Sequence, residues 1–129
     1  MEESTKNHIK IISLIAVPFL LLGIFLGQGL YNWLTGANYV DIKYRDNNVN
    51  VADSRFEHLD TSNSSFIRDA WYDSSNQYMV IDLNGTKYHY CEMPEQAWSS
   101  FKRAQSFGSH YNNKIKGNYD CRINRVPDY

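Results

Sequence analysis

The sequence predicts an α+β protein in which a single transmembrane helix precedes a small domain of three strands and two short helices. Three observations lead to this fold class. A long apolar stretch lies near the amino end, three segments of alternating polar and apolar residues follow, and two helical patterns come last. This order suits an antiparallel meander that carries both helices on one face.

The apolar stretch covers residues 11–40 and contains no Asp, Glu, Lys or Arg. Thirteen of its first twenty residues are Leu, Ile, Val or Phe. Twenty helical residues span about 30 Å, the thickness of the hydrocarbon core of a bilayer. Tyr31 and Trp33 follow, where aromatic rings favour the headgroup region. We therefore expect a transmembrane helix over residues 11–34, preceded by a polar tail over residues 1–10.

Two other interpretations of this stretch are open. A buried core helix, apolar on all sides, would need more covering protein than a chain of 129 residues offers. A cleavable signal peptide would use Lys6 and Lys10 as its basic region and Thr35-Gly36-Ala37 as its cleavage site. Because those small residues lie well beyond the apolar run, an uncleaved anchor is the prediction.

Glycine spacing within the predicted span favours helix association. Gly23 and Gly27 would lie one turn apart on one helix face, where bare backbone permits close approach of a second helix. The expectation is a homo-oligomer formed through the membrane helix.

Positive charge divides evenly across the predicted span. Lys6 and Lys10 precede it, and Lys43 and Arg45 follow it. Since Lys10 adjoins the apolar run, the balance leans towards an amino terminus in the cytosol. The expected location is a membrane, the inner membrane if the protein is bacterial.

A polar spacer is predicted over residues 35–58. Within it, Val40, Ile42 and Tyr44 alternate with charged residues, and Val49 and Val51 follow a turn at residues 46–48. This pattern predicts a short hairpin. The rest of the segment is rich in Asn, Asp and Ser and is expected to have weak structure.

Three strands are predicted at residues 66–72, 77–83 and 86–91. Asn84-Gly85 joins the last two and suits a type I′ turn, which needs positive φ at both central residues. The period of two along the third strand places Tyr88 and Tyr90 on one face, and Lys87, His89 and Cys91 on the other.

Two helices follow the strands. Pro94 suits a first helical turn, and an apolar stripe continues from there to a helix end near Gln105, formed by Ala97, Trp98, Phe101 and Ala104. Ser109 is the predicted cap of the second helix, and Gly117 is its predicted end.

An ordered set of short motifs in this region resembles the KTSC domain family. The motifs are Ser64-Ser65-Phe66-Ile67, Trp71-Tyr72-Asp73, Lys87-Tyr88-His89-Tyr90, Met93-Pro94, Gly108-Ser109-His110-Tyr111-Asn112 and Ile115-Lys116-Gly117. The family is named for its occurrence at the carboxyl end of some lysyl-tRNA synthetases, and it also occurs as small proteins in bacteria and phages. RNA binding has been suggested for it. The resemblance implies a KTSC-like domain over residues 59–121, followed by a tail at 122–129.

Catalytic chemistry has little support in the sequence. His89 and Cys91 share a strand face, the arrangement a small Cys/His hydrolase would need, but neither has a recognisable orienting acid. Cys91 and Cys121 fit either a disulfide or two free thiols, and their spacing matches no zinc pattern. No catalytic residue, metal or cofactor is predicted.

Binding residues are predicted on the third strand and the two helices. Tyr88 and Tyr90 either stack on unpaired bases or belong to the core, and the core interpretation is favoured. His89 lies between them. Phosphate contacts, if the module binds nucleic acid, would come from the basic residues of the helices, which are Lys102, Arg103, Lys114 and Lys116.

The function expected from these features is that of a non-enzymatic, single-pass membrane protein that presents a KTSC-like module to an unknown protein partner. The alternative is a membrane-tethered RNA-binding module, and a hydrolase is the third. The side of the membrane separates the first two, because nucleic acid lies in the cytosol whereas a Cys91–Cys121 disulfide requires an oxidising compartment.

Overall fold

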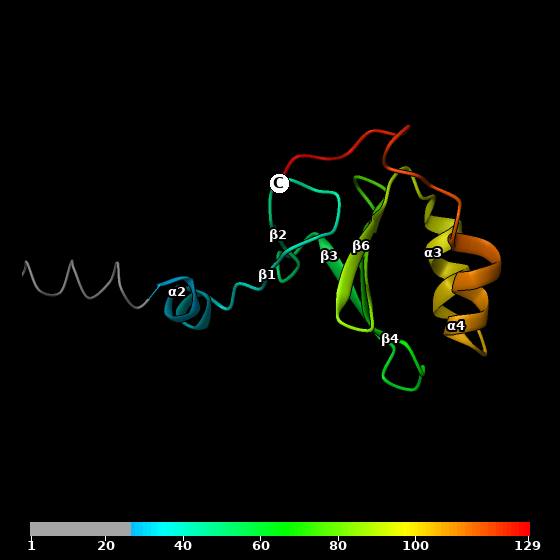
Figure 1. Ribbon diagram of the computed structural model, residues 1–129, viewed down its shortest axis with the longest axis horizontal. Coiled ribbons are helices and arrows are strands. Elements are labelled where there is room, and N and C mark those ends of the chain that lie inside the picture. Colours follow the sequence, from blue (N-terminus) through cyan, green and yellow to red (C-terminus); the bar gives the residue numbers. More distant parts are fainter. Residues whose placement is uncertain (1–26) are drawn as a thin grey trace, which may run out of the picture. The chain divides into compact units, whose positions relative to one another are not determined.

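The computed structural model describes residues 27–129 (Figure 1). The chain forms two compact units, the first ending at Gly36 and the second covering Ala37–Tyr129. The first unit contributes helix α2, Gly27–Thr35, whose large apolar side chains are exposed. Among the described residues, no helix combines the length and apolar character that crossing a bilayer requires.

Most of the predicted transmembrane helix, including Gly23, lies outside the described residues. At Gly27 the described chain differs from an uninterrupted helix, because its φ is +61°. A glycine adopts this left-handed conformation without steric cost, whereas an α-helix requires a negative φ. Helix α2 therefore begins at the second glycine of the predicted packing pair.

The second unit is built on a four-stranded antiparallel meander of order β3-β4-β5-β6. Its strands are β3, Phe56–Asp60; β4, Ile67–Asp73; β5, Tyr78–Leu83; and β6, Thr86–Tyr90. The three predicted strands correspond to β4, β5 and β6, which confirms the small α+β domain with an antiparallel sheet. Asn84 and Gly85 have φ of 53° and 95°, as the predicted turn between β5 and β6 requires.

Strand β3 was not predicted, because residues 35–58 were expected to be a weakly structured spacer. Its polar side chains find partners far away in the sequence. His58 contacts Asp69 of β4 at 2.7 Å, and Glu57 accepts hydrogen bonds from Trp98 and Lys102, which follow the sheet in the sequence. An edge strand can carry such residues because one side of it faces solvent.

The helices follow the sheet directly. They are α3, Glu95–Lys102; α4, Phe107–His110; and the π-helical turn η1, Tyr111–Ile115. Ser106, rather than the predicted Ser109, caps α4, and its side chain accepts a hydrogen bond from the Ser109 amide. Gly117 has a φ of +82° and follows η1 closely, consistent with the predicted helix end.

The helices cover one face of the sheet (Figure 1), as predicted. Trp98 stacks on Tyr72 of β4 with ring centroids 5.1 Å apart, and Phe101 packs beside Trp98. The Tyr72 hydroxyl donates to the Met93 carbonyl at 2.7 Å. These large side chains are buried and form the main core of the domain.

A second layer covers the opposite face, where the sequence predicted only a spacer and a tail. Strands β1, Tyr39–Val40, and β2, Val49–Asn50, form the predicted short hairpin. The hairpin belongs to the domain, since its valines are buried against Trp71, Tyr78 and Val80 of the sheet. Residues 37–58 are therefore part of the fold.

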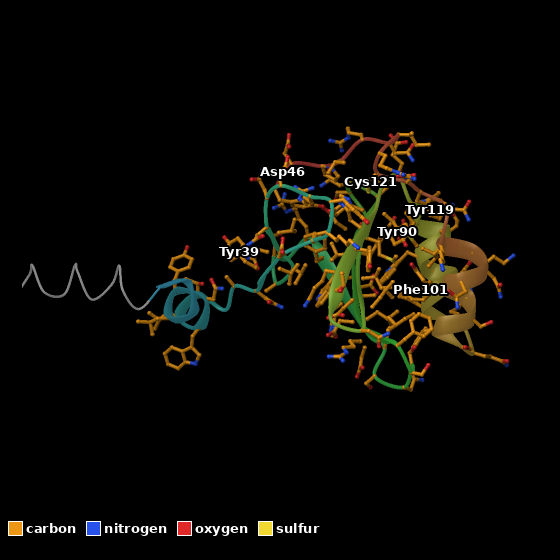
Figure 2. All side chains as sticks on the ribbon, in the orientation of Figure 1. Tyr39, Asp46, Tyr90, Phe101, Tyr119 and Cys121 are labelled. Atoms are coloured by element: carbon orange, nitrogen blue, oxygen red, sulfur yellow. A yellow bond between two sulfur atoms is a disulfide. The ribbon has the colours of Figure 1, made fainter. Side chains whose placement is uncertain are left out.

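The predicted tail at residues 122–129 also packs on this second face (Figure 2). The Tyr129 ring lies 5.2 Å from Phe56, and its hydroxyl donates to the buried carboxylate of Asp73 at 2.7 Å. The Pro127 carbonyl accepts a hydrogen bond from Arg45. Aromatic contacts and partly buried hydrogen bonds thus hold the carboxyl-terminal segment on the sheet.

Replacing Gly85 by Val should destabilise the domain by more than the ~0.5 kcal/mol of a typical surface change, because a β-branched residue resists the positive φ that this turn requires. Urea denaturation of residues 37–129 measures the effect. Thr86→Val is the matched control, since Thr86 is exposed in the adjoining strand. Equal midpoints for the two variants would contradict the turn assignment.

Candidate binding cleft at the edge of strand β6

Strand β6 presents its side chains to the two layers as predicted. Tyr88 and Tyr90 face the helical layer, where both are half-buried. The Tyr90 hydroxyl lies 2.7 Å from the Tyr111 hydroxyl, and burial is the main reason that its pKa is raised above the usual value. Both tyrosines therefore pack against the helical core and also border a surface cleft, and Tyr90 is additionally held by its contact with Tyr111.

Only some of the backbone groups along the outer edge of β6 are hydrogen-bonded by the rest of the domain. Near its start, the Lys87 carbonyl accepts a hydrogen bond from the Lys43 amide at 2.9 Å. Beyond its end, the Cys91 amide donates to the Tyr119 carbonyl at 2.8 Å. Alternate residues of a strand direct their backbone groups to the same side, so the N–H and C=O of His89 also point outwards. No backbone hydrogen bond from the described chain reaches them.

A cleft of about 570 Å³ opens over this part of the edge. It is bordered on one side by a turn at Tyr44 and on the other by residues 117–122. Its lining is mainly aromatic and polar, with side chains or backbone from Tyr44, Tyr88, His89, Tyr90, Gly117, Asn118, Asp120, Cys121, Arg122 and Val126.

Tyr44 and Tyr88 form one wall of the cleft, and Lys43 lies beside both rings. Tyr44 is 79% exposed and has a φ of 70°. The Lys43 ammonium lies 5.0 Å from the centre of the Tyr44 ring and 5.6 Å from that of Tyr88. Rings and a cation in this arrangement offer apolar contact together with positive charge.

The opposite wall carries an ion pair. Arg122 contacts the Asp120 carboxylate at 2.7 Å, and hydrogen bonds from Arg122 lower the pKa of that carboxyl group. The charges of Asp120 and Arg122 therefore offset each other within the cleft.

His89 points into the second layer, away from the helices. Its Nδ1 lies 2.8 Å from the Tyr78 hydroxyl. Burial, followed by the nearby charge of Arg45, lowers the pKa of the imidazole. Neutral His89 is thus favoured in the folded protein.

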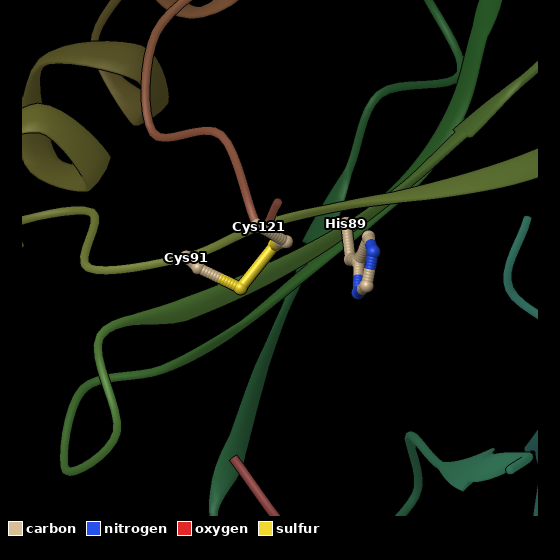
Figure 3. Close-up of side chains that lie close together, drawn as sticks. All are labelled: His89, Cys91 and Cys121. Atoms are coloured by element: carbon tan, nitrogen blue, oxygen red, sulfur yellow. A yellow bond between two sulfur atoms is a disulfide. The ribbon is translucent and has the colours of Figure 1, made fainter. Parts of the chain in front are cut away.

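Cys91 and Cys121 form a disulfide beside His89 (Figure 3). The sequence left a disulfide and two free thiols open, and the fold brings the cysteines together because residues 117–121 return to the end of β6. The bond closes a loop with a sequence separation of 30 residues. Closure of a loop of this size stabilises a folded chain by about 3–4 kcal/mol in the chain-entropy model.

The predicted basic residues do not gather at the cleft. The Lys102 ammonium pairs with Glu57 at 2.8 Å, at the β3 edge of the sheet. Arg103 follows the end of α3, while Lys114 and Lys116 lie at η1. None of the four lines the cleft beside Tyr88 and Tyr90. The residues predicted to contact phosphate and those predicted to stack on bases are therefore separated.

The surroundings of His110 and Cys91 also bear on catalysis. Burial first, and then the charge of Lys114, lowers the pKa of His110, whose ring packs 5.8 Å from that of Phe101. Cys91 is fully buried and bonded to Cys121, so it carries no thiolate for His89 to activate.

Six residues that line the cleft were missing from the predicted site: Tyr44, Gly117, Asn118, Asp120, Arg122 and Val126. Tyr44 belongs to the alternating segment that predicted the hairpin, so its position next to the predicted turn was the available signal. No local pattern marks Asp120 and Arg122, because their position depends on the return of the chain to β6.

The architecture is that of a small α+β module with helices on one sheet face and a hairpin on the other. The model of the KTSC domain family matches residues 63–119, which span β4 to just beyond η1. This part of the chain is a KTSC domain, as the resemblance implied. The search of curated proteins found no match. The hairpin, β3, Cys121 and Tyr129 lie outside the matched residues.

The stability of the domain should fall as the pH is lowered from 7.5 to 5. The unfolded state takes up a proton at His89 near the ordinary pKa of 6.5, while the folded state resists it because its pKa is lowered. The lowered pKa of His110 makes the stability fall with decreasing pH in the same way. Urea denaturation at several pH values measures the slope, which His89→Gln and His110→Gln should each reduce. An unchanged slope in both variants would contradict the assigned environments.

Proposed function

We propose that the protein is a non-enzymatic, single-pass membrane protein whose KTSC module binds an extended segment of a partner protein at the β6 edge. The observation that carries this proposal is the outward-facing backbone of His89 within the cleft. A peptide that pairs with a free strand edge gains main-chain hydrogen bonds, and pockets for its alternate side chains give specificity.

The walls of the cleft define the chemistry of this segment. Lys43, Tyr44 and Tyr88 offer apolar surface next to a positive charge. A peptide with an aromatic or aliphatic residue beside Asp or Glu matches that wall. The proposed ligand is a protein and not RNA, because Lys102, Arg103, Lys114 and Lys116 lie away from the cleft and provide no phosphate track along it.

Membrane attachment is supported by the amino-terminal sequence and by α2. The uncharged stretch at residues 11–40 is long enough to cross a bilayer. Helix α2 also exposes large apolar side chains, at Leu30, Tyr31, Trp33 and Leu34, and Trp and Tyr favour the membrane interface.

The disulfide supports placement of the module outside the cytosol. Thiols are kept reduced in the cytosol, whereas disulfides persist on the oxidising side of a membrane. The same orientation follows from the position of Lys10 directly before the apolar stretch. In this arrangement the amino terminus lies in the cytosol and the cleft faces the oxidising compartment.

Binding at the strand edge is tested by changing His89 in two ways. A displayed library of random peptides first supplies a ligand for the full-length protein, and fluorescence anisotropy then measures its Kd. His89→Pro should weaken binding at least tenfold, because proline removes the outward N–H. The fold should remain, since that N–H takes no part in the β5–β6 ladder.

His89→Ala is the matched control for that experiment. It removes the same imidazole but keeps the N–H, so it should bind the peptide nearly as well as the unaltered protein. Equal losses in both variants would contradict strand pairing. Tight, salt-sensitive binding of a single-stranded oligonucleotide would favour the RNA-binding alternative instead.

Membrane attachment predicts that the full-length protein resists carbonate extraction and that deletion of residues 1–36 releases the module. A reporter fused after Tyr129 should be active only outside the cytosol. Intact protein in the soluble fraction, or a mature form that begins near residue 38, would contradict an uncleaved anchor. Reporter activity in the cytosol would contradict the orientation.

A further inference from the structure

Three side chains of types that bind metals lie close together near the end of β6, on the sheet face that the hairpin covers (Figure 3). One ring nitrogen of His89 and the sulfurs of Cys91 and Cys121 all lie within 4.8 Å of one another. His89 and Cys91 come from alternate positions of one strand, and Cys121 comes from the segment that returns to it. A rigid strand therefore fixes two of the three ligands.

We infer that these residues form a binding site for a thiophilic divalent cation such as Zn²⁺ when the disulfide is reduced. A dithiol reductant supplies two electrons and two protons to the Cys91–Cys121 bond, yielding two thiols and an oxidised cyclic disulfide. Cation binding then releases both thiol protons, and two thiolates and one neutral imidazole hold the cation.

The ligand set matches the chemistry of Zn²⁺. Two cysteines and one histidine bind Zn²⁺ in catalytic sites that keep a fourth position open, and bond lengths of ~2.0–2.3 Å place neighbouring ligand atoms about 3.5 Å apart. The Cα atoms of the cysteines are 4.9 Å apart. Rotation of the two reduced side chains is therefore enough to open the required space.

The surroundings of the cluster favour ligation. The Tyr78 hydroxyl restrains the imidazole through its contact with Nδ1, and such outer partners orient metal-bound histidines. Cys91 is fully buried, whereas His89 and Cys121 border the cleft, so a water molecule can complete the coordination from that side.

Disulfide and cation exclude each other, because both use the lone pairs of the same two sulfur atoms. The oxidised protein is expected to bind no cation here, and the reduced protein to bind one. Either state ties residues 120–121 to β6. The site thus reports the redox state of its surroundings, and its test needs no peptide ligand.

Titration of the purified full-length protein with Co²⁺ tests the inference. After reduction with a phosphine, one equivalent should produce thiolate-to-cobalt charge-transfer absorption and visible bands typical of tetrahedral coordination. One equivalent of Zn²⁺ should remove both. The oxidised protein should show neither signal. Absence of stoichiometric binding to the reduced protein would overturn the inference.

Single substitutions test the contribution of individual ligands to Co²⁺ binding. Cys121→Ser should weaken the charge-transfer band, and His89→Ala should reduce Co²⁺ affinity by 10–100-fold while leaving the thiolates in place. His110→Ala is the matched control, since His110 lies on the helical layer. If His89→Ala binds Co²⁺ with unaltered affinity and spectrum, the histidine is not a ligand and the proposed site is wrong.

Folding of the reduced protein is monitored by circular dichroism during the same titration. If reduction unfolds the domain, Zn²⁺ should restore the folded spectrum, because a cation that binds only the folded state shifts the equilibrium towards it. Failure of Zn²⁺ either to refold the reduced domain or to raise its Tm would also overturn the inference.

Discussion

Burial of strand β5 on both faces determines where the other layers lie. Tyr78, Met79, Val80 and Ile81 are all 0% exposed, and they alternate between the two sides of the sheet. Met79 and Ile81 contact the helical core, whereas Tyr78 and Val80 contact the hairpin core. A shift of one residue would move every side chain into the wrong layer. This constraint fixes the register of β6 and, with it, the directions of Tyr88 and His89.

Local sequence patterns predicted the central elements and the short hairpin, but they did not predict β3 or the packing of the carboxyl-terminal segment. Strands β4 to β6 and helix α3 follow from alternation, the Asn84-Gly85 turn and an apolar stripe. Strand β3 did not, because Glu57 and His58 are satisfied by Trp98, Lys102 and Asp69, which local patterns cannot connect to them. The last residue, Tyr129, was likewise assigned to a tail because its partners Phe56 and Asp73 lie far away in sequence.

The candidate cleft shows the same division. Period-two alternation placed Tyr88, Tyr90 and His89 on their correct faces. The wall that contains Arg122 could not be predicted, because it depends on how the chain after η1 packs beside β6. The disulfide also requires residues 117–121 to lie beside the end of β6, so composition alone could not distinguish a disulfide from two free thiols. Segments on either side of the residues that match the KTSC family contribute Tyr44 and Cys121. In this chain the added second layer thus completes both the cleft and the cluster around His89.

The Cys91–Cys121 bond has a mechanical consequence when the two ends of the domain are pulled apart. Tension applied between Ala37 and Tyr129 would cross from Cys91 to Cys121 through the sulfur atoms and would bypass α3, α4 and η1. The sequence separation of 30 residues corresponds to roughly 100 Å of extended chain that stretching could not release. The helices would therefore bear no load while the bond is intact, and a reducing agent would lengthen the molecule under force.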